Sequence, residues 1–240
     1  MRAVALALAV VATLGVAVPA KGDPAPTRDL TGLVAPYLRA RDDRAVGDVQ
    51  GHSLGDAARP TAPPVPYDGV SVMLFPRSPD FEGQLTTIKA HLRDSLNTYM
   101  GGTAEVTQAR MAYERDLLAA GGGELIRGEV SNAQGDIRLN GVPAGDWLLL
   151  AWRDVAHPGK TPKLQTSDKT GFRNVPVEVG YSTVTYWFMP VTVRAGESTP
   201  IDLNDRNVWL TGIHEDIRTI EGTPKKHTGS GPGSNTQRRP

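Results

Sequence analysis

The stretch NAQGDIRLNGVPAGDWLLLAWRD, residues 132–154, decides the fold of this 240-residue chain. NAQG, Asn140-Gly141 and Pro143-Ala144-Gly145 are turn-forming sequences. Between and after them, the apolar residues predict strands over 136–139 and 146–154. The second strand is apolar on both faces, with Trp147, Leu149 and Ala151 on one and Leu148, Leu150 and Trp152 on the other. Such a strand must be covered on both sides, so the stretch predicts a layered, mainly β fold.

The surrounding sequence supplies one cover for each face of this strand. Apolar patterns predict further strands over 70–75, 124–130, 183–193, 200–203 and 207–210, which form the opposite sheet and its neighbours. Apolar residues at helical spacing predict two helices within 81–120, broken at Gly101-Gly102, with Thr103 capping the second helix. We expect this helical hairpin to cover the second face of the 146–154 strand. The alternative is that it forms a partner-binding or dimerisation surface.

The N-terminus has the order of charges and apolar residues that is typical of an export signal. Arg2 is followed by the uncharged apolar run 3–18 and by the small residues of Val18-Pro19-Ala20. This predicts a signal peptide over 1–20 that is removed on export, leaving no membrane span in a secreted or periplasmic protein. The alternative is a retained membrane anchor, for which the run is short.

The rest of the chain divides by composition. We expect a short helix within 27–43 and a proline-rich linker ending at 66, so that 21–66 lies outside the folded domain. The domain itself is expected to span 67–213. The segment 221–240 is rich in Gly, Pro, Ser, Thr and basic residues and is predicted to be disordered.

The order of these motifs resembles the carboxypeptidase regulatory-like domain, a small β-sandwich related to transthyretin-like and Cna-B-type modules. The resemblance covers roughly 67–210 and rests on DGVSVML (68–74), SNAQGDIRLNGVPAGDWLLLAWRD (131–154) and VTVRAGESTPIDL (191–203). It implies an Ig- or transthyretin-like antiparallel β-sandwich of a bacterial exported subset, into which the helical hairpin is inserted. Members of this family are mostly non-catalytic. The internal Lys–Asn isopeptide bond of some Cna-B-type domains is not expected, because the strand over 69–75 has no lysine.

Composition excludes several classes of function. The 26 basic and 26 acidic residues cancel, whereas a nucleic-acid-binding domain normally has a basic excess. The chain has no cysteine, which excludes disulfides, thiol catalysis and cysteine metal sites. No two histidines have a metal-ligand spacing, and we expect neither a metal nor a cofactor. His214-Glu215-Asp216 is interpreted as part of a solvated terminal segment.

Two short motifs match functional patterns by letter. GHSLG, residues 51–55, places Ser53 at the nucleophile position of Gly-x-Ser-x-Gly. The charged sequence before it and Pro60 after it argue against the required strand–turn–helix, so we expect a flexible linker and no catalytic residue. Asp202, Asn204 and Asp205 gather oxygen atoms at a strand end. They form either a calcium site or a turn closed by side-chain hydrogen bonds.

The strand aromatics are the remaining candidates for binding. An exposed indole ring can stack on a sugar, and we single out Trp152 and Trp187 as ligand-binding candidates. The alternative for each is packing in the core. The sequence therefore predicts a non-catalytic binding or structural domain that mediates protein interactions in the cell envelope. The alternative is a carbohydrate-binding module that uses the strand tryptophans.

Overall fold

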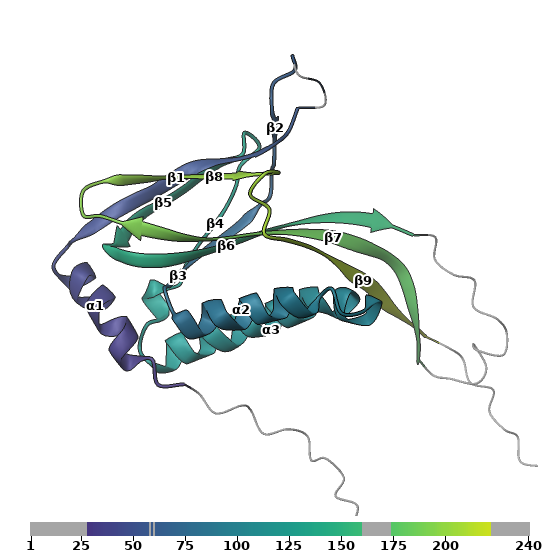
Figure 1. Ribbon diagram of the computed structural model, residues 1–240, viewed down its shortest axis with the longest axis horizontal. Helices are drawn as coiled ribbons and strands as arrows, with labels where there is room; N and C mark the ends of the chain where they lie inside the picture. The colour runs from purple at the N-terminus through teal and green to yellow at the C-terminus, as the bar shows by residue number, and fades with distance from the viewer. Residues whose placement is uncertain (1–27, 58, 60, 160–173, 222–240) are drawn as a thin grey trace, which may run out of the picture.

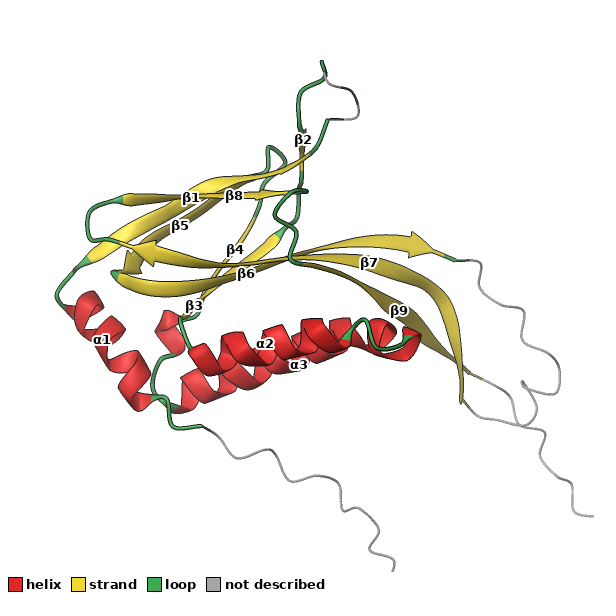
Figure 2. Ribbon diagram, in the orientation of Figure 1, coloured by secondary structure: helices red, strands yellow, loops and turns green. Residues whose placement is uncertain are grey.

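The computed structural model describes residues 28–57, 59, 61–159 and 174–221 and shows two β-sheets with a layer of helices against the second (Figures 1 and 2). The elements, in chain order, are α1 (Thr31–Asp42), β1 (Val46–Gly55), β2 (Val65–Pro66), β3 (Ser71–Pro76), α2 (Pro79–His91), α3 (Leu96–Ala119), a 3-10 turn (Gly123–Leu125), β4 (Arg127–Val130), β5 (Asp136–Pro143), β6 (Gly145–Pro158), β7 (Asn174–Val193), β8 (Ser198–Asn204) and β9 (Leu210–Glu221). The predicted β-sandwich with a helical hairpin is confirmed.

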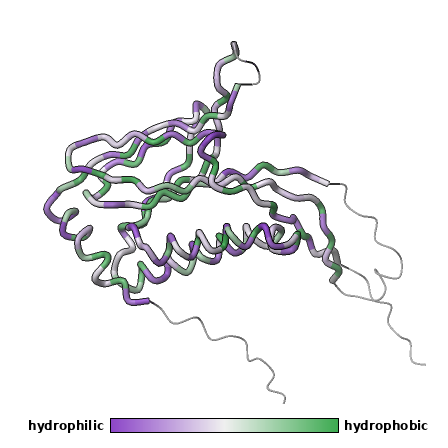
Figure 3. Tube along the Cα trace, in the orientation of Figure 1, coloured by the Kyte–Doolittle hydropathy of each residue, from purple (hydrophilic) through white to green (hydrophobic). Residues whose placement is uncertain are grey.

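The two sheets differ in their strand directions. In the first sheet, β1 lies between β8, which runs parallel to it, and β5, which runs antiparallel. The short β2 pairs with the end of β1. The second sheet has the order β4-β3-β6-β7-β9, with every pair antiparallel. Hydrophobic segments gather where the two sheets and the helices face one another (Figure 3).

The strand β6 is buried on both faces, as its sequence predicts. Residues 147–151 have no exposed surface. Phe75 contacts Phe81 and Tyr113 of the helices, with ring centroids 6.0 and 5.9 Å apart, so its cross-strand partner Leu148 also lies on the helical side. The Tyr113 hydroxyl donates a hydrogen bond of 2.7 Å to the Pro76 carbonyl. The α2–α3 hairpin therefore covers the second sheet, as expected.

The boundary between the two helices was predicted wrongly. α2 ends at His91, and α3 begins after Ser95, whose side chain and that of Thr98 form a reciprocal capping box. The expected break at Gly101-Gly102 lies inside α3, and Thr103 is a buried interior residue. A Cβ atom on Gly102 would lie 2.0 Å from Leu92 Cδ2. This glycine therefore allows the close approach of Leu92, and it does not end a helix.

The region preceding residue 67 corrects the expected domain boundary. α1 forms as predicted and buries Val34 and Tyr37. Residues 46–55, however, are not a flexible linker. They form β1, the strand that pairs with β2, β5 and β8 in the first sheet. Val49 and Ser53 point into the core and are fully buried, whereas Asp48 is exposed. The other inward positions are glycines, so the strand carries almost no hydrophobic signal.

The C-terminal strands extend further than the sequence predicts. β7 begins at Asn174, before the expected start at 183, and the last strand is β9 over Leu210–Glu221, where 207–210 was expected. His214, Glu215 and Asp216 therefore belong to a paired strand and not to a solvated tail. The ends of β6, β7 and β9 project beyond the sandwich as a three-stranded extension (Figure 1). The predicted signal peptide 1–20 lies outside the described residues, as does the predicted disordered tail 221–240 except for Glu221, which is the last residue of β9.

Candidate functional site

The two tryptophans singled out from the sequence lie on opposite faces of the second sheet. Trp187 of β7 has no exposed surface. Its Nε1 donates a hydrogen bond of 2.9 Å to the Asn204 carbonyl of the opposite sheet, and its ring lies 6.2 Å from that of Tyr67. A ring enclosed between the sheets cannot stack on a ligand, so the prediction for Trp187 is wrong.

Trp152 remains accessible because it lies on the helical face beside α3 and not beneath it. The side chain is partly buried, and the Arg110 guanidinium lies 5.1 Å from the ring centroid. Arg110 also pairs with Glu114 one turn further along α3. The contact between cation and ring holds the indole against α3 while leaving part of it in reach of solvent.

Trp152 of β6, together with residues of β3 and β4, lines an open groove, which we call the Trp152 groove. Its volume is about 440 Å³, and its lining residues are Ser71, Val72, Met73, Gly128, Glu129, Val130 and Trp152. Val130, in the edge strand β4, is 55% exposed. The groove thus combines one accessible indole ring with the exposed apolar side chain of Val130 and the partly buried Met73.

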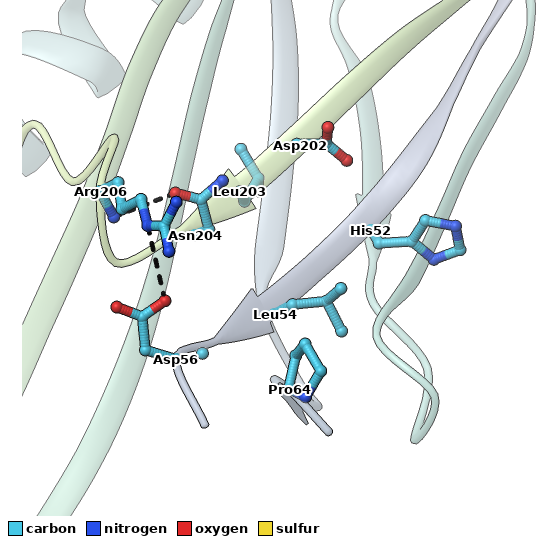
Figure 4. A pocket seen from close by; sticks show the side chains of 9 residues that line it. His52, Leu54, Asp56, Pro64, Asp202, Leu203, Asn204 and Arg206 are labelled. Atoms are coloured by element: carbon cyan, nitrogen blue, oxygen red, sulfur yellow. Dashed lines mark hydrogen bonds and ion pairs between the residues drawn. The ribbon is translucent and has the colours of Figure 1, made fainter. Parts of the chain in front are cut away.

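A second hollow lies on the outer face of the first sheet (Figure 4). His52 of β1 and Asp202 of β8 line both of its parts, which have volumes of about 260 and 350 Å³. The His52 Nδ1 lies 2.9 Å from an Asp136 carboxylate oxygen on β5. We call this hollow the outer trough. It lies open to solvent and offers hydrogen-bonding groups beside apolar surface, but no Phe, Tyr or Trp side chain lines it.

The oxygen cluster at the end of β8 is a turn closed by side chains. The Asn204 Oδ1 accepts a hydrogen bond of 3.0 Å from the Arg206 amide, and the Asn207 Oδ1 accepts one of 2.8 Å from the Asn204 amide. Asp205 accepts hydrogen bonds from the Tyr67 hydroxyl and the Asp56 amide, at 2.6 and 2.7 Å. Among the described residues, no three His, Asp or Glu side chains are placed to hold a metal ion.

The pKa values of Tyr67 and Asp205 reflect this arrangement. Burial, followed by the hydrogen bond to Asp205, raises the pKa of Tyr67 to about 12. The hydrogen bond from Tyr67, followed by that from the Asp56 amide, lowers the pKa of Asp205. The pair therefore exists as a neutral phenol bound to a carboxylate at neutral pH, and it ties β2 to the turn between β8 and β9.

Ser53 has no nucleophile geometry. It lies within β1, is fully buried, and its hydroxyl is 2.7 and 3.1 Å from the carbonyl oxygens of Tyr67 and Gly135. A catalytic serine needs an exposed hydroxyl on a sharp strand-to-helix turn. Ser53 instead joins β1 to its neighbours, which also makes the expected flexible linker at this position wrong.

Comparisons with known proteins do not place the chain in a family. No known protein family matches it, and neither does any curated protein. In the part of the chain that the structure describes, no helix is long and apolar enough to cross a membrane. By its fold, the chain is a two-sheet β-sandwich protein with a helical hairpin covering one sheet.

Three solved structures give partial matches. A candidate carbohydrate-binding protein of Pseudomonas aeruginosa is 10% identical over 67% of this chain and 88% of its own, with a TM-score of 0.36. The pilus backbone protein RrgB of Streptococcus pneumoniae is 17% identical over 49% of this chain and 32% of its own, with a TM-score of 0.20. The minor pilin GBS52 of Streptococcus agalactiae is 10% identical over 66% and 94%, with a TM-score of 0.24. At these scores the similarity establishes neither a shared topology nor a shared function.

Proposed function

We propose that the chain is an exported, non-catalytic binding domain of the bacterial cell envelope that docks a protein partner in the Trp152 groove. The observation that carries the proposal is an open groove in which the accessible ring of Trp152 lies together with the exposed apolar side chain of Val130 and the partly buried Met73. The signal peptide predicted over 1–20 and the resemblance to the carboxypeptidase regulatory-like domain support export and the non-catalytic role.

The groove has the composition of a protein-binding surface. Contiguous exposed apolar side chains with a polar rim mark interaction sites, and tryptophan and arginine are the residues most often found at their centres. Here the indole and Arg110 form the centre, and the polar groups beside them are Glu114, which pairs with Arg110, and Ser71. The outer trough has no Phe, Tyr or Trp side chain to form such a centre, so the Trp152 groove is the stronger docking site.

Site-directed photo-crosslinking tests this proposal. Because the chain has no cysteine, the groove variants Ser71→Cys and Val130→Cys each carry a photo-crosslinker at one position only. We expect both variants to crosslink the same envelope protein and expect Trp152→Ala, added to either, to reduce the yield at least about tenfold, because tryptophan anchors contribute about 2 kcal/mol or more. Arg138→Cys, exposed on the outer face of the first sheet, is the matched control and should not crosslink that protein.

Crosslinks that are equally strong from Arg138→Cys, or that do not depend on Trp152, would contradict the proposal. The second candidate function is carbohydrate binding at the same groove, favoured by an accessible indole with the Arg110–Glu114 ion pair beside it. A saturable change of tryptophan fluorescence on titration with soluble glycans, lost in Trp152→Ala, would establish that function in place of protein docking.

A further inference from the structure

The outer edge of β9 forms a surface distinct from the Trp152 groove. Within the described residues, β9 pairs with β7 only, so its other edge presents free backbone hydrogen-bonding groups. Near the middle of the strand, Asp216 and Arg218 lie on one face, with side chains 48% and 72% exposed. Ile217, between them, points to the opposite face and is 57% exposed.

This edge lacks several of the usual protections against pairing, although it carries the charged side chains of Glu215, Asp216 and Arg218. Edge strands are normally kept short, or are interrupted by proline, bulges or charged side chains that point inward. The strand β9 contains no proline, and the bulge at its pairing with β7, between Glu178 and Gly180, lies in β7. The C-terminal part of β9 belongs to the three-stranded extension that projects beyond the sandwich (Figure 2). An exposed isoleucine at the centre of such an edge favours the addition of another strand.

We propose that β9 pairs antiparallel with β9 of a second copy of this chain, centred on Ile217, so that the two five-stranded sheets become continuous. With Ile217 opposite its own copy, Asp216 of each copy lies opposite Arg218 of the other. Two pairs of opposite charges then flank the central pair of isoleucines, and Glu215 lies opposite Thr219. Cross-strand pairs of opposite charge and of β-branched residues each stabilise antiparallel pairing.

Charge selects this register over its neighbours. Moving the centre of pairing to Asp216 or to Arg218 would place Asp216 opposite Asp216 or Arg218 opposite Arg218. Like charges directly opposite one another destabilise the pair. The edge is therefore self-complementary in one register, which is the property that a symmetric homodimer requires of its interface.

Charge exchange tests the pairing. We expect the purified full chain to form dimers in sedimentation equilibrium at micromolar concentrations. Asp216→Arg alone, or Arg218→Asp alone, places like charges opposite each other and should raise the dimer dissociation constant at least tenfold. The double variant Asp216→Arg/Arg218→Asp recreates both opposite-charge pairs and should restore the constant to within about threefold of the wild type. Since the two side chains are exposed, circular dichroism should show an unchanged fold.

Disulfide trapping provides a second measurement that does not depend on these charges. In the cysteine-free chain, Ile217→Cys should form a disulfide-linked dimer on mild oxidation, because the two copies of residue 217 are adjacent. Thr219→Cys is the control: its two copies would lie about 13 Å apart along the strands, too far to bridge. A monomer at 100 µM, a dimer that Asp216→Arg leaves unchanged, or equal trapping by both cysteines would overturn the proposal. If the edge pairs with a strand of a different protein instead, the purified chain would remain a monomer at 100 µM.

Discussion

Trp187→Ala is expected to lower the free energy of unfolding by about 3–5 kcal/mol, the range for removal of a fully buried large aromatic side chain. The ring has no exposed surface and fills the space between the sheets. Its removal also leaves the Asn204 carbonyl without the hydrogen bond from Nε1. Urea denaturation followed by circular dichroism measures the change.

Two further variants separate the causes of this loss. Trp187→Phe keeps an aromatic ring and removes the hydrogen bond, so its cost should be roughly half that of the alanine variant. Trp152→Ala removes a partly exposed ring at the edge of α3, and we expect a cost below about 2 kcal/mol. Equal losses from Trp152→Ala and Trp187→Ala would contradict the finding that Trp187 lies between the sheets and Trp152 does not.

Gly51→Ala is expected to destabilise the protein by about 3 kcal/mol or more, although it adds a single methyl group. A Cβ atom on Gly51 would lie 1.6 Å from the Ile201 carbonyl oxygen of the parallel strand β8. Backbone atoms cannot rotate away as a side chain does, so the β1–β8 pair must separate locally. Differential scanning calorimetry should show a lower melting temperature together with a smaller unfolding enthalpy.

Gly83→Ala is the matched control for this prediction. Gly83 lies inside α2, and a Cβ atom there would meet nothing within 4 Å. Alanine is the better helix former, so this variant should gain about 0.5–1 kcal/mol. If both glycine variants changed stability by similar amounts, the close approach of β1 and β8 would not be the cause.

The helical hairpin and the central strand β6 were predictable from the sequence because their signals are local. Gly135 and Gly141 have positive φ angles of 77° and 64°, as their turn sequences predict. The apolar residues of β6 alternate between two faces, and the strand register confirms which residues share each face. Periodicity of side chains along one segment records directly how that segment is buried.

The strand β1 and the boundary between α2 and α3 were missed for the same physical reason. At Gly51 and Gly102 the deciding feature is how closely another segment approaches, namely the Ile201 carbonyl in one case and Leu92 in the other. A glycine required for close packing and a glycine that ends an element have the same letter in the sequence. Their roles differ only through neighbours that are distant along the chain or lie across a turn.

The sequence by itself determined the layered β-sandwich, the double-sided burial of β6 and the presence of two covering helices, because periodic burial is carried by side chains within each segment. Only the tertiary structure decided which tryptophan is accessible. Trp152 and Trp187 differ in what covers them: the first lies beside α3, and the second lies under the opposite sheet. It also decided which strand is left with a free edge at Ile217. Coverage and free edges depend on where the segments meet in space, which no single segment encodes.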